Sequence, residues 1–238
     1  MIAHPELRER VLEANRELVQ AGLVVLTFGN ASGVDRSAGV MAIKPSGVPY
    51  GELRAESMVV VDLAGGEVLG GSLSPSSDTP THLALYRSFE SIGGVVHTHS
   101  PAATAWAQAA RPIPCFGTTH ADHFHGAVPV TRDLNPDEIR ERYEAATGDA
   151  IVETIEGLRL DPLEMPAVLV RSHGPFAWGA SEADAVENAR ALEAVASMGL
   201  DSVALAPQLT PIGHDLAERH FTRKHGPGAY YGQRKPPS

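Results

Sequence analysis

The stretch Gly93-Gly94-Val95-Val96-His97-Thr98-His99-Ser100 decides both the fold and the chemistry of this chain. Its small and apolar residues predict a buried strand that begins at Gly94 and ends in two histidines. Side chains at positions i and i+2 of a strand point to the same face, with their roots about 6.5 Å apart. His97 and His99 are therefore expected to converge on one ion while Thr98 faces the opposite layer. Taken alone, however, such a pair is also typical of an ordinary polar strand exit.

Short strands and helices alternate irregularly on both sides of this stretch. The predicted helices span 5–21, 79–90, 101–110, 135–147, 181–198 and 215–224, and the predicted strands span 23–28, 40–43, 58–62, 67–69, 94–99 and 167–171. No dinucleotide-binding glycine motif, P-loop or internal repeat is present, and no linker-like stretch divides the chain. We expect one α/β domain over 1–238, with a mostly antiparallel or mixed central sheet flanked by helices on both faces and a Gly-, Tyr- and Pro-rich tail at 226–238.

Composition and charge narrow the class of protein. The 238 residues are 43% hydrophobic and 20% charged, as in a soluble globular domain. Acidic residues outnumber basic ones 29 to 19, which disfavours nucleic acid or an anionic membrane as partner. The longest apolar runs, such as 23–26, are far shorter than the ~20 residues that a membrane span needs. Because Cys115 is the only cysteine, no intrachain disulfide can form, and a cytoplasmic location is expected.

Two further residues extend the candidate metal site. His173 follows the apolar run 167–170 and precedes Gly174-Pro175, so it lies at the mouth of a predicted strand. Asp78 lies at the start of a predicted helix, where an acid is a candidate ligand but is also common for capping alone. Three imidazoles and one carboxylate suit Zn²⁺ or another divalent ion such as Mn²⁺ or Co²⁺. The absence of a C-x-x-C pair argues against a purely structural zinc site.

Three turns carry small polar residues that suit an anion. They are Gly29-Asn30, Lys44-Pro45-Ser46-Gly47 and Ser74-Pro75-Ser76-Ser77. Hydroxyls, free backbone N–H groups and one lysine can bind a phosphate monoester, and the last turn precedes a predicted helix N-terminus. Each turn alone is explained by capping chemistry. Three of them beside a candidate metal site favour an anion-binding cradle over capping alone.

Two polar features outside these turns are candidates for proton transfer. Asp122 ends the polar loop Gly117–Asp122 within an apolar neighbourhood, where it is either an acid or base or an ordinary turn residue. Tyr230 and Tyr231 lie in a Gly-rich tail that follows a basic stretch. Adjacent tyrosines there fit either a hydrophobic docking strip or a phenol delivered to a site, including one on a neighbouring subunit.

Seven motifs together resemble the L-ribulose-5-phosphate 4-epimerases, the epimerase branch of the class II aldolase family. The motifs are G-N-A-S (29–32), K-P-S-G (44–47), P-S-S-D-T-P-T-H (75–82), G-G-V-V-H-T-H-S (93–100), G-T-T-H-A-D (117–122), S-H-G-P-F-A-W-G (172–179) and the segment from R-K-H-G to Y-Y-G-Q (223–233). They span nearly the whole chain. The resemblance departs at His123 and His125, where relatives often carry aromatic residues, and in the extension at 234–238.

The resemblance implies a homotetramer of α/β subunits with active sites at the subunit interfaces. It implies a zinc-like ion held by His97, His99 and His173, with Asp78 near or on the metal; the aldolase branch typically has glutamate at that position. It places the substrate phosphate against a cradle of six residues: Asn30, Ser46, Gly47, Ser76 and Ser77, with Lys44 close by. It makes Asp122 and Tyr231, the latter from the next subunit, the two acid–base groups. The implied supporting residues are Thr118, Glu144, His220 and Arg223.

The implied reaction is the interconversion of L-ribulose 5-phosphate and D-xylulose 5-phosphate, an isomerase step of arabinose catabolism. The C4 proton of a 2-ketose is not α to the carbonyl, and no nicotinamide motif supports a hydride route, so the C3–C4 bond must open and close again. A divalent ion stabilises the resulting enediolate, and two faces of the aldehyde need two proton-transfer groups. A class II sugar-phosphate aldolase that releases both fragments is the alternative, and a non-catalytic metal-binding scaffold is a third hypothesis.

Overall fold

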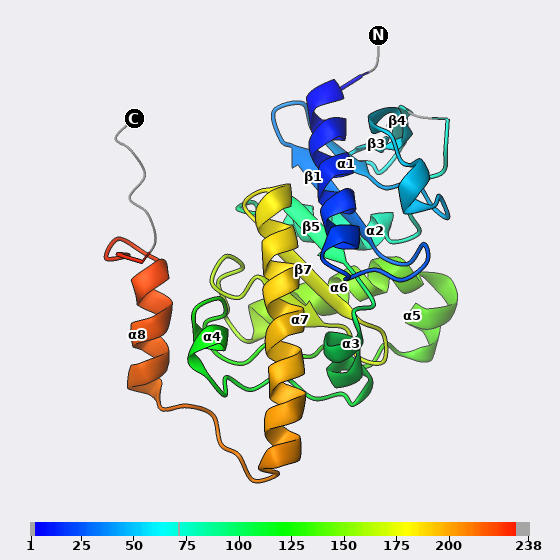
Figure 1. Cartoon of the computed structure of the whole chain (residues 1–238). Coiled ribbons are helices and arrows are strands. Elements are labelled where there is room, and N and C mark those ends of the chain that lie inside the picture. Colours follow the sequence, from blue (N-terminus) through cyan, green and yellow to red (C-terminus); the bar gives the residue numbers. More distant parts are fainter. Residues whose placement is uncertain (1–2, 71, 232–238) are drawn as a thin grey trace.

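One sheet with seven strands runs through the protein, and every neighbouring pair of strands is antiparallel (Figure 1). The computed structural model describes residues 3–70 and 72–231. The strands are β1 (Asn30–Asp35), β2 (Val40–Ile43), β3 (Val59–Asp62), β4 (Val68–Gly70), β5 (Gly94–His97), β6 (Ala167–Leu169) and β7 (Pro175–Gly179). Their spatial order is β4-β3-β2-β1-β5-β7-β6, so β5 lies between two segments that are distant in sequence. This order confirms the expected α/β class with an antiparallel sheet.

Helices cover both faces of the sheet (Figure 1). On one face lie α1 (Pro5–Gln20) and α7 (Glu182–Leu205), and on the other lie α2 (Thr79–Ser88) and α6 (Tyr143–Gly157). Ser32 of β1 shows how the second pair is attached, because its hydroxyl lies 2.6 Å from His82 Nδ1 and 2.9 Å from the Tyr86 hydroxyl, both on α2. The remaining elements are η1 (Tyr50–Glu52), η2 (Ala55–Ser57), α3 (Pro101–Gln108), α4 (Thr118–Ala121), α5 (Pro136–Glu141) and α8 (His214–Lys224).

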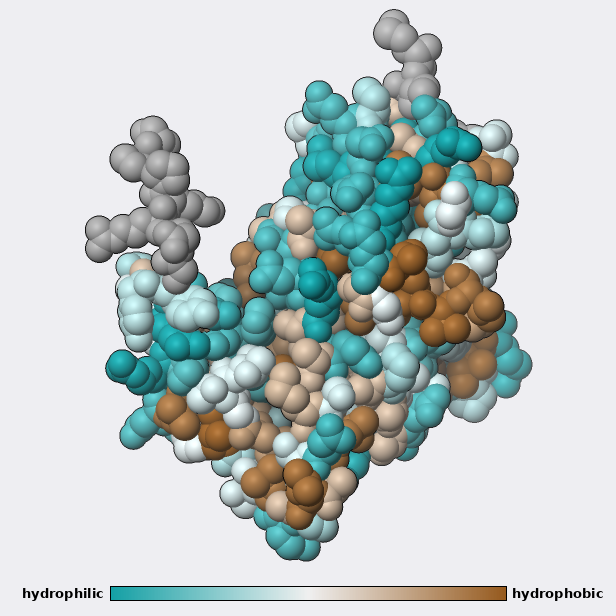
Figure 2. Space-filling model, in the orientation of Figure 1, coloured by the Kyte–Doolittle hydropathy of each residue, from teal (hydrophilic) through white to brown (hydrophobic). Residues whose placement is uncertain are grey.

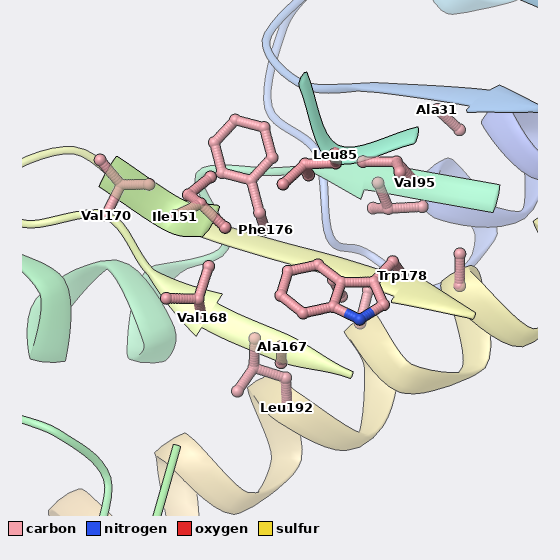
Figure 3. Close-up of a cluster of buried hydrophobic side chains, with 14 of the residues drawn as sticks. Ala31, Leu85, Val95, Ile151, Ala167, Val168, Val170, Phe176, Trp178 and Leu192 are labelled. Carbon is pink, nitrogen blue, oxygen red and sulfur yellow. The ribbon is translucent and has the colours of Figure 1, made fainter. Parts of the chain in front are cut away.

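Strand β7 contributes two large aromatic side chains to the core. Phe176 and Trp178 are both fully buried, and Figure 3 shows them among Val168, Ile151 and Leu192 from neighbouring elements. Burial of one such side chain stabilises the fold by about 1.5–3 kcal/mol. The indole Nε1 of Trp178 donates to the Pro162 carbonyl at 2.8 Å, so its one polar atom is satisfied. Strand β7, which lies between β5 and β6, is therefore firmly packed and supports the residues at its ends.

The predicted strand over 23–28 is wrong. These residues form turns and irregular backbone, with Leu26 at φ 55° and 78% exposed. The strand begins instead at Asn30, which pairs with His97 across β1 and β5. An apolar run predicts a buried strand only if the fold covers it, and here Val25, Leu26 and Phe28 remain 50% or more exposed.

Four other features of the fold differ from the sequence-based expectation. The predicted helix over 135–147 is two helices, α5 and α6, which meet at Arg142 with φ −155° and ψ 43°. Strand β7 was not predicted at all, and the expected loop at 117–122 contains the short helix α4. Strand β5 ends at His97, so His99 lies beyond it and the two histidines do not converge through strand alternation alone.

The surface view in Figure 2 shows apolar residues in small groups on a mostly hydrophilic face. Within the part of the chain that the structure describes, we find no helix with the length and apolarity needed to cross a membrane. The tail is described as far as Tyr231, and the extension at 234–238 lies outside the described residues.

Candidate active site

Three histidines from two places in the sequence meet at one end of the sheet. His97 ends β5, His99 follows two residues later, and His173 lies in the turn between β6 and β7. Antiparallel pairing sets His97 opposite Phe176 and brings that turn beside the end of β5. His99 Nε2 lies 3.1 Å from His97 Nε2 and 3.1 Å from His173 Nε2. One ligand nitrogen from each ring lies within 4.8 Å of the other two.

The turn that carries His173 depends on close backbone approach. Ser172 has a positive φ of 61°, and the N–H of Val170 donates to the Gly174 carbonyl at 2.9 Å. A Cβ atom on Gly174 would lie 2.7 Å from the Thr98 carbonyl oxygen. Glycine is therefore required at 174, because any side chain would push the turn away from the strand end that carries His97 and His99.

The three imidazoles fit a divalent metal. His97 Nδ1 lies 2.9 Å from the Pro175 carbonyl, which can only accept, so Nδ1 carries the proton and the Nε2 lone pair faces the other rings. Ligands bound tetrahedrally to zinc at about 2.0–2.1 Å lie about 3.3 Å from one another, close to the spacing seen here. Burial lowers the pKa of His97 to about 3 and also lowers the pKa of His99 and His173. Neutral rings are the form that binds metal.

Asp78 lines the same cavity but does not belong to the cluster of three. Its Oδ2 accepts a hydrogen bond from Asn30 Nδ2 at 2.7 Å. Burial alone would raise the pKa of Asp78, but His97, His82 and the Asn30 hydrogen bond outweigh it and lower that pKa. An ionised carboxylate beside three neutral imidazoles suits a cation, and the role of Asp78 as a fourth ligand stays a prediction.

Two loops join to form the expected anion cradle. The N–H of Ser46 donates to the Ser74 carbonyl at 3.0 Å, and the N–H of Ser76 donates to the Lys44 carbonyl at 3.0 Å. Gly47 has a φ of 68°, a left-handed conformation that favours glycine. The six cradle residues, the three histidines, Asp78 and Glu144 all line one cavity of about 390 Å³, here called the histidine pocket. Its volume falls within the range of about 300–1,000 Å³ typical of small-molecule sites.

Lys44 is the strongest sign that the histidine pocket takes an anion. It is only 2% exposed, and its Nζ contacts the Pro45 carbonyl at 3.3 Å and the ring of Tyr50 at 4.8 Å. Among the described residues no carboxylate lies within 4.0 Å of this ammonium group. Burial lowers the pKa of Lys44 because the charged form loses hydration. Asn30 Oδ1, in the same cavity, is also buried and has no hydrogen-bond partner in the part of the chain that the structure describes. A ligand with anionic oxygens and hydroxyl donors would satisfy both groups.

The two predicted proton-transfer groups lie elsewhere in the chain. Asp122 and Tyr231 line a second cavity of about 520 Å³, here called the tail depression, which shares no lining residue with the histidine pocket. Arg223 binds the Asp122 carboxylate through two contacts of 2.8 and 2.5 Å and lies 4.6 Å from the ring of Tyr231. His220 Nδ1 lies 3.1 Å from Asp122 Oδ1. Burial alone would raise the pKa of Asp122, but the hydrogen bonds from Arg223 and His220 outweigh burial, and the net effect is a lowered pKa.

The predicted supporting residues divide in the same way. Glu144 lines the histidine pocket, and His220 and Arg223 belong to the Asp122 cluster. Thr118 also belongs to that side, since its carbonyl accepts from the N–H of Asp122 at 2.9 Å. Within one chain, the residues that resemblance assigns to a single site therefore form two separate groups.

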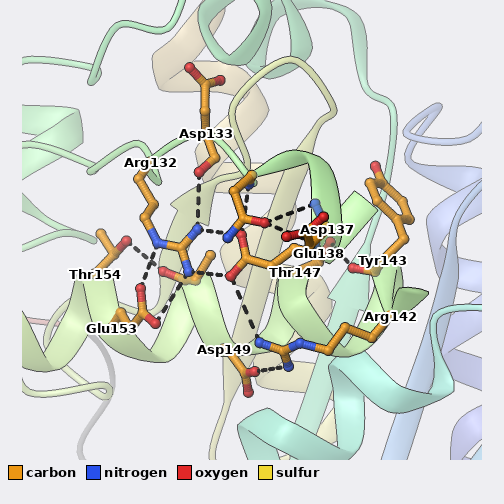
Figure 4. A network of polar contacts seen from close by, with 12 residues as sticks. Arg132, Asp133, Asp137, Glu138, Arg142, Tyr143, Thr147, Asp149, Glu153 and Thr154 are labelled. Atoms are coloured by element: carbon orange, nitrogen blue, oxygen red, sulfur yellow. Dashed lines mark hydrogen bonds and ion pairs between the residues drawn. The ribbon is translucent and has the colours of Figure 1, made fainter. Parts of the chain in front are cut away.

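Sequence reasoning missed Tyr143, which precedes Glu144 in α6. Its hydroxyl lies 3.3 Å from His173 Nδ1, and it lines the histidine pocket. Thr147 Oγ1 donates to the Tyr143 carbonyl at 2.9 Å. Figure 4 shows the ion pairs around this helix junction, including Arg132 with Glu138 and Arg142 with Asp149. The position of Tyr143 next to Glu144 could have indicated its role. The prediction of one continuous helix over 135–147 missed the break at Arg142, after which Tyr143 begins α6.

Comparisons with known proteins agree with this geometry. The chain belongs to the class II aldolase and adducin N-terminal domain family, whose model matches residues 9–200. The structure is similar to an L-fuculose 1-phosphate aldolase (TM-score 0.78, 24% identity, 93% of this chain and 97% of that one). It is also similar to YgbL from Klebsiella pneumoniae, described as a candidate aldolase, epimerase or decarboxylase (TM-score 0.70, 27% identity, 90% and 97% coverage). A third match is the L-fuculose 1-phosphate aldolase from Glaciozyma antarctica PI12 (TM-score 0.74, 19% identity, 96% and 87% coverage).

Family membership confirms the resemblance at the level of the family and confirms the expected fold. It favours metal-dependent sugar-phosphate chemistry at the histidine pocket. All four predicted metal ligands and all six cradle residues lie together in that pocket.

Replacing Lys44 by Met will weaken anion binding and stabilise the free protein. The variant removes a buried charge without a carboxylate partner, so its Tm should rise, while the loss of a charged hydrogen bond should raise the Kd for inorganic phosphate about tenfold or more. Calorimetric titration and thermal unfolding measure the two effects. Arg190→Met, at an exposed position, is the matched control and should change neither. An unchanged phosphate Kd in Lys44→Met would contradict the assignment.

Replacing Tyr143 by Phe will weaken metal binding. The variant keeps the ring but removes the oxygen that accepts from His173 Nδ1, and loss of such an outer contact lowers metal affinity by about tenfold or more. Competition with a chromophoric chelator measures the zinc Kd. Tyr230→Phe is the control, because the Tyr230 side chain is 66% exposed. Equal zinc affinities in both variants and the wild type would exclude this role for Tyr143.

Proposed function

We propose that the protein is a metal-dependent isomerase that interconverts L-ribulose 5-phosphate and D-xylulose 5-phosphate. The observation that carries the proposal is one cavity that contains three converging imidazoles and a buried lysine without a carboxylate partner. A ketose phosphate fits both parts of this cavity: its adjacent oxygens suit a metal held by the histidines, and its phosphate dianion suits the cradle. With Cys115 as the only cysteine, we assign the reaction to the cytoplasm.

The cradle and the histidines have separate tasks in this reaction. The cradle holds the phosphate, so that the two-carbon aldehyde cannot diffuse away while it turns over its other face. His97, His99 and His173, with Asp78 beside them, hold the metal. The chemistry that a bound divalent ion supplies is Lewis-acid stabilisation of negative charge on the ketose oxygens. Tyr143 keeps the His173 ring oriented through its Nδ1–H.

Proton transfer falls to Asp122 and Tyr231 in this proposal. One group takes the C4 hydroxyl proton as the C3–C4 bond opens, and the other returns a proton after the aldehyde has rotated. The lowered pKa of Asp122 keeps its carboxylate ionised, as a proton acceptor requires. Its neighbours His220, Arg223 and Thr118 fix its position.

The separation of the two cavities supports a site shared between subunits. The tail depression and the histidine pocket share no lining residue, and a second chain that contributes one of them would bring both groups to one substrate. We therefore propose that both Asp122 and Tyr231 reach the histidine pocket of a neighbouring subunit, within a homotetramer. This extends the sequence-based expectation, which assigned only Tyr231 to the next subunit.

The second candidate is a class II sugar-phosphate aldolase, which the similarity to L-fuculose 1-phosphate aldolase favours. The same metal and cradle would serve net cleavage. Asp78, where the resemblance gives aldolases a glutamate, favours the epimerase. A scaffold without catalysis fits less well, because a buried unpaired lysine destabilises a protein that binds no anion.

Incubation of the zinc-loaded protein with L-ribulose 5-phosphate tests the proposed reaction. We expect D-xylulose 5-phosphate to accumulate, with turnover lost after chelation and restored by added zinc. Accumulation of dihydroxyacetone and glycolaldehyde phosphate would instead establish the aldolase. Full activity in chelator-stripped protein would overturn the metal assignment, and no turnover of any sugar phosphate would favour the scaffold.

Mixing two inactive variants tests the shared site. His97→Asn lacks one half of the site and Asp122→Asn lacks the other, so each alone should be inactive. Subunit exchange at equal amounts should restore about one quarter of wild-type activity, because one intact pair forms when one chain of each kind meets in the right order. Mixing His97→Asn with His173→Asn is the control and should restore nothing. Mixed oligomers without activity in the first pair would contradict a site shared between chains.

A further inference from the structure

Helix α8 is attached to the rest of the protein by a small contact area. Its main packing partner is the short helix α4, and Phe221 is its one buried side chain. Figure 1 shows α8 beside α4 at the edge of the molecule, joined to α7 by a long connection. Yet α8 carries His220 and Arg223, which hold the Asp122 carboxylate. One buried phenylalanine is little to fix a helix, so polar contacts must decide where α8 lies.

His125 is the centre of those contacts. Its backbone N–H donates to the Glu164 carbonyl at 3.0 Å, which fixes the residue on the body of the protein. Its Nδ1 lies 3.1 Å from the Glu164 carboxylate, and its Nε2 lies 2.6 Å from the carboxylate of Glu218 on α8. The imidazole therefore bridges the body and the helix.

The ring of His125 also stacks on the helix. It lies 4.4 Å from the ring of Phe221 at an angle of 10°, and Phe221 in turn stacks on His225 at 4.3 Å. His225 Nε2 lies 3.0 Å from the backbone carbonyl of Asp122. A continuous series of contacts thus runs from His125 through α8 to the residue that carries the proposed proton acceptor.

Both ring nitrogens of His125 face carboxylates, and this sets its charge. A neutral imidazole has one N–H and one lone pair, so it can satisfy only one of the two acceptors and would repel the other. Only the imidazolium donates to both. The groups that face His125 are Glu164 from the segment before β6 and Glu218 from α8, with His225 on the far side of the Phe221 ring.

We infer that His125 is a positioning residue whose imidazolium clamps α8 to the body of the protein and so holds the Asp122 and Tyr231 region in place. The clamp follows from the contacts alone. Its effect on turnover rests on the proposed function, because only there do Asp122 and Tyr231 transfer protons. The chemistry predicts a clamp that opens when the ring loses its proton.

The direction of the pH dependence follows from the sign of the shift. Burial alone would lower the pKa of His125, but hydrogen bonds and charge from Glu218 and Glu164 outweigh it and raise that pKa. A raised pKa in the folded state means that the stabilisation is fully present below the ordinary histidine value and is lost as the pH rises through the raised value. The clamp is therefore closed at mildly acidic pH and opens toward alkaline pH.

Amide hydrogen exchange of the oligomeric protein tests the clamp without any substrate. His125→Phe keeps the stack on Phe221 but removes both ion pairs. Because half-exposed pairs are weak individually, we expect it to lower protection factors over 216–224 by roughly three- to tenfold at about pH 6.5. Wild-type protection factors should fall by a similar factor between about pH 6.5 and about pH 9, and those of His125→Phe should stay nearly constant. His214→Phe, at an exposed position of the same helix, should behave as the wild type.

Glu218→Gln provides a second test, since it removes only the helix arm and should reproduce most of the effect. Equal protection over α8 in wild type, His125→Phe and Glu218→Gln, at either pH, would overturn the clamp. With substrate, His125→Phe should lower kcat with unchanged zinc content and KM, and this difference should vanish at alkaline pH. Altered exchange in a protein that turns over no pentulose phosphate would refute the proposed function and leave the clamp standing.

Discussion

The antiparallel pairing of β5 with β7 brings the three histidines together at one end of the sheet. It sets His97 against Phe176, with ring centroids 4.2 Å apart, and it brings the Pro175 carbonyl to His97 Nδ1. Strand β7 begins directly after the turn that carries His173. Three neutral imidazoles with converging lone pairs are unfavourable without a cation, so the buried core of β7 must hold them in place. Sheet stability and metal affinity are in this way properties of the same contacts.

The anion side of the pocket shows the opposite relation between stability and function. Lys44 is buried with a carbonyl and an aromatic ring as its neighbours, and burial disfavours its charged form. A hydrophobic residue of similar size would suit the free protein better. The lysine makes sense as a group whose missing partner arrives with the ligand, which is the kind of destabilised site that function retains against stability.

Local patterns in the sequence were sufficient to predict most of the residues that line the histidine pocket. Four patterns identified ten residues that line one cavity: the H-x-H pair, the apolar run before His173, the acid Asp78 at a predicted helix start, and the Ser- and Gly-rich turns. Strand β7 was not predicted because it includes Pro175 and Gly179, which are typical of turns, and the apolar segment between them is very short. Tyr143 was missed because hydrophobic periodicity does not reveal the break between α5 and α6. Arg142 forms ion pairs with Glu138 and Asp149 at that break. A sequence pattern likewise cannot show whether the histidine pocket of one subunit lies beside Asp122 and Tyr231 of another.

The division of the candidate residues between two cavities has an energetic meaning. The proposed metal and anion ligands lie at strand ends and on hydrogen-bonded loops of the central sheet, where burial makes their positions costly to change. Asp122 and Tyr231 lie beside α8, which one buried phenylalanine and a few charged contacts hold. If proton transfer crosses a subunit interface, association orders α8 as well as completing the site, and part of the association free energy is spent on that ordering. Contacts that pre-order α8 in the free chain, His125 first among them, reduce this cost and thereby strengthen both assembly and the geometry of proton transfer.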